Sequence, residues 1–239
     1  MAEPPYRRVV LKISGESLCS PGGSGIDPAA MGAVTEEIAS VAKGAAQLGL
    51  VVGAGNFIRG RDLAAATCVR RATADSMGML ATLVNGLALR DALADAGIET
   101  RVMSAIPAGT ICETFSRDRA VEHLSAGRVV LFAGGTGSPF FTTDMAAALR
   151  ACEIGAQIVL KATKVDGVYD SDPMSNPAAR KYDRLTYGQV LADRLGVMDL
   201  AAVGMCMDNH IPVLVFQFSQ PGNLARAMGG QDVGTLITD

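Results

Sequence analysis

The 239-residue chain is poor in the features that build several kinds of protein. Its five cysteines are odd in number and none is spaced Cys-x-x-Cys, so neither a disulfide framework nor a zinc site is predicted. No apolar stretch approaches the roughly 20 residues of a membrane span, and the opening MAEPPYRRVV lacks the apolar run of a secretory signal. The net charge of −3 would not gather nucleic acid or an anionic membrane. We therefore expect a cytoplasmic protein that binds neither a nucleic acid polymer nor a membrane.

Several catalytic signatures are missing as well. The sequence has no GxxxxGK[ST], no HRD or DFG triplet and no GxSxG, which excludes the P-loop and protein-kinase patterns and gives nucleophilic catalysis little support. The two histidines, His123 and His210, lie outside the loops described below, and we expect both to be structural.

Short apolar runs that alternate with helical stretches make up the rest of the chain. The strands are predicted at Val9–Ile13, Leu50–Val52, Thr100–Met103, Val129–Ala133, Ile158–Leu160 and Val213–Phe216. Asp27-Pro28 starts one predicted helix, and another runs from about Ala72 to Ala96 with Met77, Leu80, Val84 and Leu87 on one face. This alternation predicts an α/β fold with a mainly parallel sheet covered on both faces. Ligands of such sheets gather at the carboxyl ends of the strands.

Four loops at those ends carry residues that suit phosphate groups. The first is Lys12–Ser17, and the second is Gly53–Gly60, with glycines and Arg59 but no complete dinucleotide fingerprint. The third, Gly134–Asp144, is dense in glycines and hydroxyls and ends where Thr142 or Thr143 can cap a helix. The fourth, Lys161–Tyr169, contains two lysines and a tyrosine. Three of the five lysines lie in these loops, which predicts two phosphorylated ligands or one long one.

The blocks LKISGE, GAGNFIRG, DSMGMLATLVNGLALRDAL, MSAIP, GTGSPFFTTD, LKATKVDGVYDSDP and VMDLAA resemble, in order, the bacterial UMP kinases of the amino acid kinase superfamily. The resemblance covers almost the whole chain. It implies one three-layer α/β/α sandwich domain over 1–239, with the acceptor side and an oligomer interface in 1–150 and the ATP side in 151–239. It also implies a homohexamer built as a trimer of dimers, Mg²⁺ carried by ATP, GTP as activator and UTP as inhibitor.

The same resemblance assigns residues to each ligand. ATP would be bound by Lys12, Ile13, Ser14, Gly15, Gly55, Arg59, Thr163, Tyr169 and Asp172. UMP would be bound by Ala54, Asp75, Thr136, Gly137, Ser138, Pro139, Phe140, Phe141, Thr142 and Thr143. The effector residues would be Ser20, Pro21, Gly22, Gly23, Ser24, Gly25, Arg90, Arg101 and Arg128.

Two positions depart from the family pattern. Ala54 replaces the middle glycine of GGGN, where a methyl group removes easy access to positive φ and crowds a ligand. Ser138 replaces the asparagine of GTGNPFFTTD and weakens one expected UMP contact. The segment Ser20–Gly25 (SPGGSG), which the resemblance links to GTP activation, also differs from the family pattern.

As a hypothesis of mechanism, the acceptor is a phosphate oxygen that is largely ionised at neutral pH, since the second pKa of such esters is about 6. No general base is then needed, and catalysis is positioning and charge neutralisation of an in-line transfer. The residues expected to carry it are Lys12 and Lys161 for charge, Arg59 for phosphate orientation, and Asp144 as organiser or Mg²⁺ partner. The alternatives are a kinase for a carboxylate or carbamate, a nucleotide-binding storage or regulatory protein of the same fold, and, far behind, a Rossmann dehydrogenase.

Overall fold

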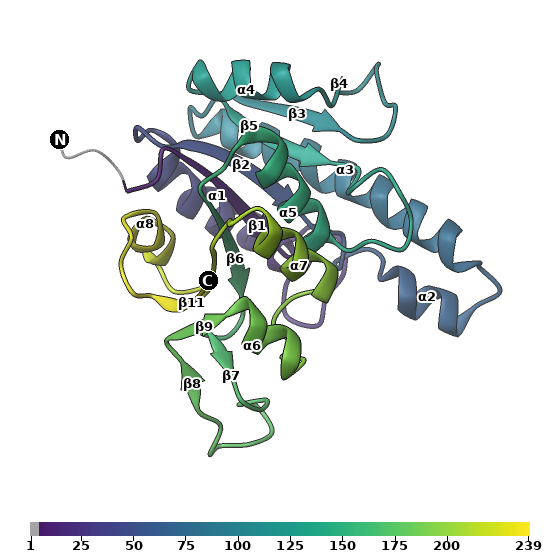
Figure 1. Cartoon of the computed structure of the whole chain (residues 1–239). Helices are drawn as coiled ribbons and strands as arrows, with labels where there is room; N and C mark the ends of the chain where they lie inside the picture. The colour runs from purple at the N-terminus through teal and green to yellow at the C-terminus, as the bar shows by residue number, and fades with distance from the viewer. Residues whose placement is uncertain (1–4) are drawn as a thin grey trace.

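The structure is a computed structural model that describes residues 5–239; the first four residues of the predicted 1–239 domain, which include part of the opening discussed above, lie outside the described part, as does the side chain of Arg61. A nine-stranded sheet runs through the molecule in the order β4-β3-β5-β2-β1-β6-β10-β11-β9 (Figure 1). Its strands are β1 Arg8–Ile13, β2 Gln47–Val52, β3 Thr100–Ser104, β4 Glu113–Thr114, β5 Val129–Ala133, β6 Ile158–Thr163, β9 Arg184–Thr186, β10 Val213–Gln217 and β11 Gly234–Thr238.

Neighbouring strands are parallel from β4 to β10, whereas β11 is antiparallel to β10 and parallel to β9. All five residues of β5 are buried, as expected for a strand with helices on both faces of its sheet. The mainly parallel sheet is confirmed.

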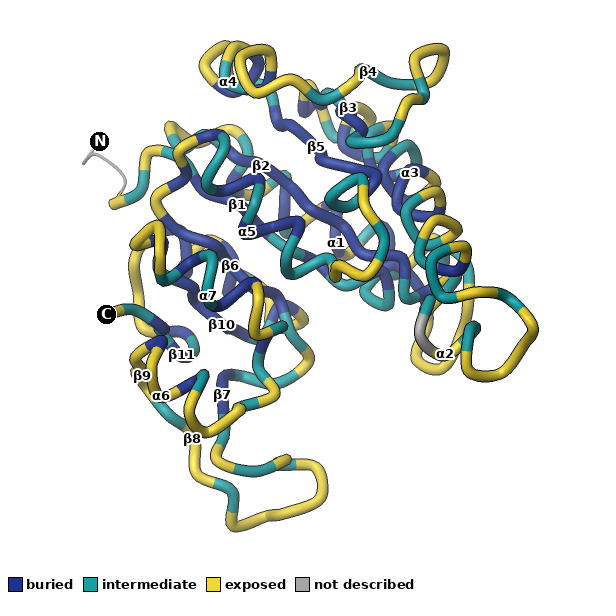
Figure 2. The backbone as a smooth tube through the Cα atoms, turned by 45° about the vertical axis from the view of Figure 1, so that its right-hand side comes forward, coloured by how far each residue is buried: buried dark blue, intermediate teal, exposed yellow. Residues whose placement is uncertain are grey.

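Helices cover both faces of this sheet. The covering helices are α1 Pro28–Ala42, α3 Arg71–Asp95, α4 Arg117–Ser125, α5 Thr143–Ile154, α6 Tyr187–Ala192, α7 Leu200–Asp208 and α8 Asn223–Met228, together with the 3-10 helix η1 Gly15–Leu18. Helix α2 Gly60–Ala66 instead packs against α3. One apolar core joins the sheet to α1, α3 and α8, and a second joins its other face to α4, α5, α6 and α7. The predicted three-layer α/β/α sandwich is therefore confirmed (Figures 1 and 2).

Helix boundaries follow local chemistry. Asp27 caps α1 by accepting a 2.9 Å hydrogen bond from the Ala30 amide, and Pro28 occupies the first turn, where its missing N–H costs nothing. Thr142 caps α5, which ends at Gly155 in the left-handed conformation (φ 66°). Both predicted helix starts are confirmed.

Helix α3 differs from a plain core helix. Met77, Leu80 and Val84 do share a face, but this face points outward, with exposed fractions of 37%, 56% and 48%. The opposite side packs into the core through Leu83, Leu89 and others. Apolar periodicity fixes which residues share a face, but not whether another layer covers it.

Two further features matter for the site. Strand β6 continues beyond the predicted Leu160 to Thr163, so Lys161 lies within the strand and not in a loop. The short antiparallel strands β7 Val168–Tyr169 and β8 Lys181–Tyr182 form a hairpin whose exposed tip projects from the body (Figures 1 and 2).

Within residues 5–239, no helix has both the length and the apolar character to cross a bilayer.

Candidate active site

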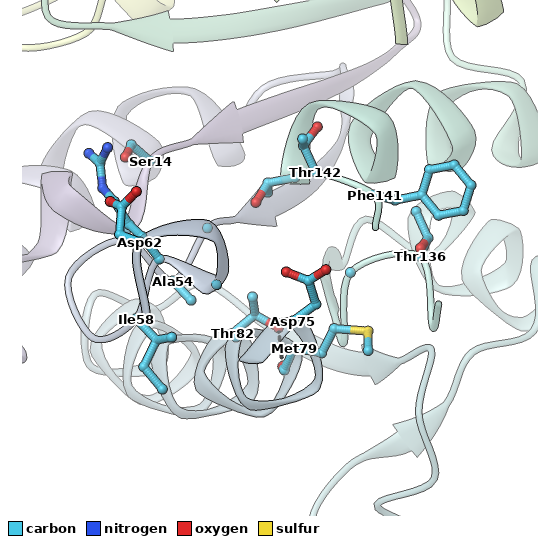
Figure 3. A pocket seen from close by; sticks show the side chains of 18 of the residues that line it. Ser14, Ala54, Ile58, Asp62, Asp75, Met79, Thr82, Thr136, Phe141 and Thr142 are labelled. Atoms are coloured by element: carbon cyan, nitrogen blue, oxygen red, sulfur yellow. Dashed lines mark hydrogen bonds between the residues drawn. The ribbon is translucent and has the colours of Figure 1, made fainter. Parts of the chain in front are cut away.

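A cavity of about 410 Å³ opens at the carboxyl ends of β1, β2 and β5. Its wall on α3 is made by Asp75, Gly78, Met79 and Thr82, whose spacing places them on one side of the helix. Arg71, the first residue of α3, lines the same wall. The other lining residues come from three of the predicted loops and the start of α2: Lys12, Ser14, Gly15, Glu16, Gly53, Ala54, Gly55, Ile58, Arg59, Gly60, Asp62, Gly135, Thr136, Ser138, Phe141, Thr142 and Thr143. Figure 3 shows Ser14 and Ala54 on one side of this space and Thr136 and Phe141 on the other.

A second cavity, of about 520 Å³, is built from the chain after residue 160. It brings together Thr163, Tyr169 and Asp172, the three residues expected at the adenosine end of ATP. Lys161 also lines it, along with the turn 193–197 that precedes α7. The fourth predicted loop and this turn therefore enclose one space.

An ion triad of Lys12, Asp144 and Lys161 adjoins both cavities. Lys12 on β1 and Lys161 on β6 are paired in register, so their side chains leave the sheet on the same face at neighbouring positions. Asp144, in the first turn of α5, lies 2.9 Å from the Lys12 Nζ through Oδ1 and 2.6 Å from the Lys161 Nζ through Oδ2. Lys161 also donates to the Val197 carbonyl. Because Lys12 lines the first cavity and Lys161 the second, the triad marks their junction.

Burial and charge set the proton affinities of this triad. Burial alone would raise the pKa of Asp144, but the adjacent Lys12 and Lys161 outweigh it and hold the pKa of this carboxyl below its usual range. Burial lowers the pKa of Lys161, against the attraction of Asp144, and the nearby charge of Lys12 lowers it further. The triad therefore keeps an ionised carboxylate between two lysine side chains.

The glycine-rich loop after β5 is shaped by backbone conformation. Gly134 (φ 76°) and Gly137 (φ 83°) adopt left-handed conformations, and a Cβ on Gly134 would approach the Ala105 and Ile106 amides to 3.0 Å. Phe140 is also left-handed (φ 71°), which is strained for an aromatic residue, and its amide donates a 2.9 Å hydrogen bond to Asp75 Oδ2. Asp75 is also paired at 2.9 Å with Arg71. This carboxylate therefore links α3 to the loop across the first cavity.

Glu16 is a site residue that our sequence reasoning missed, although it lies in the block LKISGE. Its carboxylate pairs with Arg59 and, at 2.8 Å, with Lys164. A carboxylate at this place orients two cations of neighbouring loops at the rim of the first cavity. Nothing in the sequence alone pairs residues that far apart.

The structure resolves the question raised by Ala54. Among the described residues, the non-glycine positions with positive φ are Phe140, Arg194 and His210, so Ala54 has no strained backbone. Its methyl group is mostly buried (8% exposed) and lies at the cavity wall. The expectation of a backbone penalty at this position is therefore wrong. What remains is the space that the methyl group occupies at the cavity wall.

Several predicted residues do not line either cavity. The side chain of Ile13 is fully buried in the core, and its carbonyl accepts from the Gly53 amide at 2.9 Å. Gly137, Pro139 and Phe140 belong to the loop but not to the lining. The histidines also lie elsewhere: His123 is buried between Glu113 and Arg128, and His210 is exposed beside Asp239.

The expected effector residues fall into separate places. Arg90 and Arg101 line a third cavity of about 360 Å³. Arg128 is joined to Arg101 because both guanidinium groups donate to Glu99, at 2.9 and 2.7 Å. The segment Ser20–Gly25 is not part of this lining and instead contacts Asn56 through Gly25.

The first cavity can hold a phosphorylated ligand because cations, glycine-loop backbone and hydroxyls face one space. Residues 5–239 contain no cluster of three or more His, Cys, Asp and Glu side chains that could enclose a metal ion by themselves. Oδ1 of Asp144 is buried, and its contact is the 2.9 Å ion pair with Lys12. One such carboxylate suits an ion that arrives with phosphate groups, as Mg²⁺ does.

Comparison with known proteins identifies the class. The pattern of the amino acid kinase family matches residues 7–217, and the chain belongs to this family. A uridylate kinase of Xanthomonas euvesicatoria pv. vesicatoria is 51% identical over 237 residues, which cover 99% of this chain and 98% of the relative. The crystal structure of UMP kinase from Bacillus anthracis has a TM-score of 0.95 at 39% identity, covering 98% of this chain and 97% of the other. For UMP kinase from Ureaplasma parvum these values are 0.91, 37%, 98% and 99%.

Proposed function

We propose that this protein transfers the γ-phosphate of ATP to UMP, giving UDP and ADP, as a step of pyrimidine nucleotide biosynthesis. Relatives of about 50% identity over the whole chain and structural neighbours of the same activity support it. The observation that carries it is the Lys12–Asp144–Lys161 triad at the junction of two cavities. A group passing directly between two ligands would cross this junction.

Within that reaction, each side of the site has a proposed role. The ATP phosphates would contact Lys12, Ser14, Gly15, Gly55 and Arg59, with Ile13 contributing at most backbone, and the adenosine end would lie in the second cavity. UMP would be held by Asp75, Ala54 and the Thr136–Thr143 segment. Residues 1–150 would then carry acceptor binding and residues 151–239 most of ATP binding.

Phosphoryl transfer to UMP requires positioning and charge neutralisation rather than a general base. A UMP phosphate oxygen is already largely ionised at neutral pH. No histidine is among the described residues that line the two cavities, which agrees with this mechanism. Lys12 and Lys161 would neutralise the transferring group, Arg59 would orient phosphate, and Asp144 would hold both ammonium groups in place.

We also propose Mg²⁺ as the metal, brought by ATP and contacted on the protein side by Asp144. Bound there, it would neutralise phosphate charge. The position of Asp144 at the junction of the two cavities supports this choice.

Assembly and regulation complete the proposal. A homohexamer built as a trimer of dimers would cover the exposed apolar residues of α3. GTP would activate and UTP inhibit, with Arg90, Arg101 and Arg128 responding to the nucleotide and Ser20–Gly25 moving with it. The third cavity, lined by two of these arginines, supports an anionic effector. The protein would act in the cytoplasm.

The test measures ADP formation from ATP and Mg²⁺ with UMP, CMP, dUMP, acetylglutamate and aspartate as separate acceptors. Turnover with UMP, well above that with the amino acids, is expected. Turnover with an amino acid alone would instead establish a carboxylate kinase. Nucleotide binding without turnover of any acceptor would establish a storage or regulatory protein.

A further inference from the structure

Two buried asparagines lie directly behind the glycine-rich loops of the first cavity. Asn56 lies in the middle of the loop that follows β2 and is 2% exposed, whereas Asn85, on α3, is fully buried. Figure 3 shows the neighbourhood through Ala54 of the same loop and Thr82 of the same helix, which line one cavity. Neither asparagine is among the residues that line this cavity.

The two side-chain amides are bonded to one another in both directions. Asn85 Nδ2 donates to Asn56 Oδ1 at 2.8 Å, and Asn56 Nδ2 donates to Asn85 Oδ1 at 3.0 Å. Each amide nitrogen has one further acceptor: Asn85 donates to the Gly53 carbonyl at 2.8 Å, and Asn56 to the Gly25 carbonyl at 2.7 Å. Both amides thus use their full donor capacity inside the protein.

The backbone completes this network. The Gly25 amide donates to the Asn56 carbonyl at 2.8 Å, so Gly25 is bonded to Asn56 twice. A methyl group on Gly15 would lie 2.5 Å from Asn56 Oδ1 and 2.7 Å from the Gly55 nitrogen, so the first glycine loop packs against the second at this point. The pair therefore contacts both phosphate-facing loops, the segment that ends at Gly25, and α3.

We propose that Asn56 and Asn85 form a positioning pair for phosphoryl transfer, which fixes the Gly53–Gly55 backbone against Gly15 and ties it to α3. This inference rests on the proposed function. Asn85 stands ten residues along the same helix from Asp75, so one rigid element carries the acceptor contact and the support of the loop. Because both amides are buried and all their N–H groups are hydrogen-bonded, the two side chains are held in one arrangement. The backbone that lines the cavity is thereby held in one position as well.

The same network joins the loop to the segment Ser20–Gly25. A displacement of Gly25 would be transmitted to Asn56 through two hydrogen bonds. It would pass from Asn56 to Asn85 through the paired amides, and from Asn85 to the Gly53 carbonyl. Any effector that orders or moves this segment would therefore act on the phosphate-facing backbone through the asparagine pair.

The experiment compares Asn85→Ala, Asn56→Ala and the double variant by steady-state kinetics with ATP and UMP. Asn85→Ala removes the bonds to both Gly53 and Asn56, so its kcat is expected to fall about tenfold to a hundredfold. Asn56→Ala leaves the hydrogen bond from Asn85 to Gly53, so its kcat is expected to fall less than that of Asn85→Ala, but still by about fivefold or more. The double variant should resemble Asn85→Ala, since residues that act as a unit have non-additive effects.

The matched control is Asn223→Ala. Asn223 is as deeply buried (3% exposed) and donates at 3.0 Å to the Gln217 carbonyl, but it lies on α8 and lines none of the cavities described here. Its variant should lower the melting temperature as the others do, with kcat within about twofold of the unmodified protein. Amide hydrogen exchange in residues 53–57 should accelerate in the Asn56 and Asn85 variants only.

The outcomes separate this inference from the proposed function. UMP turnover by the unmodified protein, with kcat unchanged in folded Asn85→Ala, would overturn the inference alone. An equal loss of kcat in Asn223→Ala would also overturn it, because the effect would then be one of general stability. If Asn85→Ala does not fold, unchanged kcat in Asn56→Ala decides against the pair. Failure of the unmodified protein to phosphorylate UMP would overturn both.

Discussion

Asp144 offers the sharpest test of the site, through the variant Asp144→Asn. The substitution keeps the shape of the side chain and removes one negative charge between two ammonium groups at 2.9 and 2.6 Å. At an effective dielectric constant of about 20, each of these ion pairs is worth about 6 kcal/mol before desolvation is subtracted. Removing one partner of a buried ion pair typically costs about 3–5 kcal/mol, because the remaining charge is left uncompensated.

For a protein of this size, that loss corresponds to a melting temperature lower by about 6–20 °C. The kcat for UDP formation should fall about a hundredfold or more, since both lysines lose the group that orients them. Thermal unfolding and steady-state kinetics check the two effects. Asp118→Asn, at an exposed carboxylate on α4 that lines neither cavity, is the matched control and should change neither quantity substantially.

The pH dependence of stability gives an independent check. Because the pKa of Asp144 is lower in the folded than in the unfolded protein, its contribution is fully present above the unfolded-state pKa and is lost as pH falls through the folded-state value. The difference in melting temperature between the unmodified protein and Asp144→Asn should therefore be largest near neutral pH and narrow in acid, below the usual range of aspartate. Equal stability of the two proteins at neutral pH would refute the triad.

Two further substitutions test the acceptor side. Asp75→Ala should chiefly raise KM for UMP, by about tenfold or more, because Asp75 both faces the cavity and holds the Phe140 amide; a change in KM for ATP instead would reverse the assignment of the two ligands. Ala54→Gly should leave kcat with UMP within about twofold and lower the stability by about 0.5–1 kcal/mol, since Ala54 has no positive φ and glycine only adds freedom to the unfolded chain. A large gain in kcat would show that the methyl group obstructs the ligand.

Much of the fold could be predicted because local chemistry decides it. Asp27-Pro28 and the Thr142 hydroxyl start α1 and α5 where the sequence indicated, and the buried strand Val129–Ala133 was found to the residue. The ends of strands are harder to predict where no turn residue follows. Strand β6 was predicted to end at Leu160, yet it continues through Lys161 to Thr163. A lysine inside a buried strand is stable only with a partner, and that partner is Asp144.

The candidate site was predictable in residue type but not in pairing. The glycine-rich loops and the lysines predict phosphate binding by their residue types alone. The structure places these residues around two adjoining cavities. The sequence alone does not predict that Glu16 pairs with Arg59 and Lys164. It also does not predict that Asn56 is hydrogen-bonded to Asn85. An asparagine on an apolar helix has many acceptable partners, and only the packing of α3 beside the second loop selects one.

The triad shows how sheet order creates chemistry that no single segment contains. Lys12 and Lys161 are about 150 residues apart in the sequence, but β1 and β6 are neighbours and their register puts the two lysines side by side. Neighbouring strands lie about 4.8 Å apart, so two ammonium groups on the same face repel each other unless an anion lies between them. Asp144 supplies that anion from the first turn of α5, near the amide groups that favour negative charge. In the proposed reaction, a phosphate group entering from either cavity would meet the same two lysines, so the arrangement that stabilises the fold would also receive the transferring group.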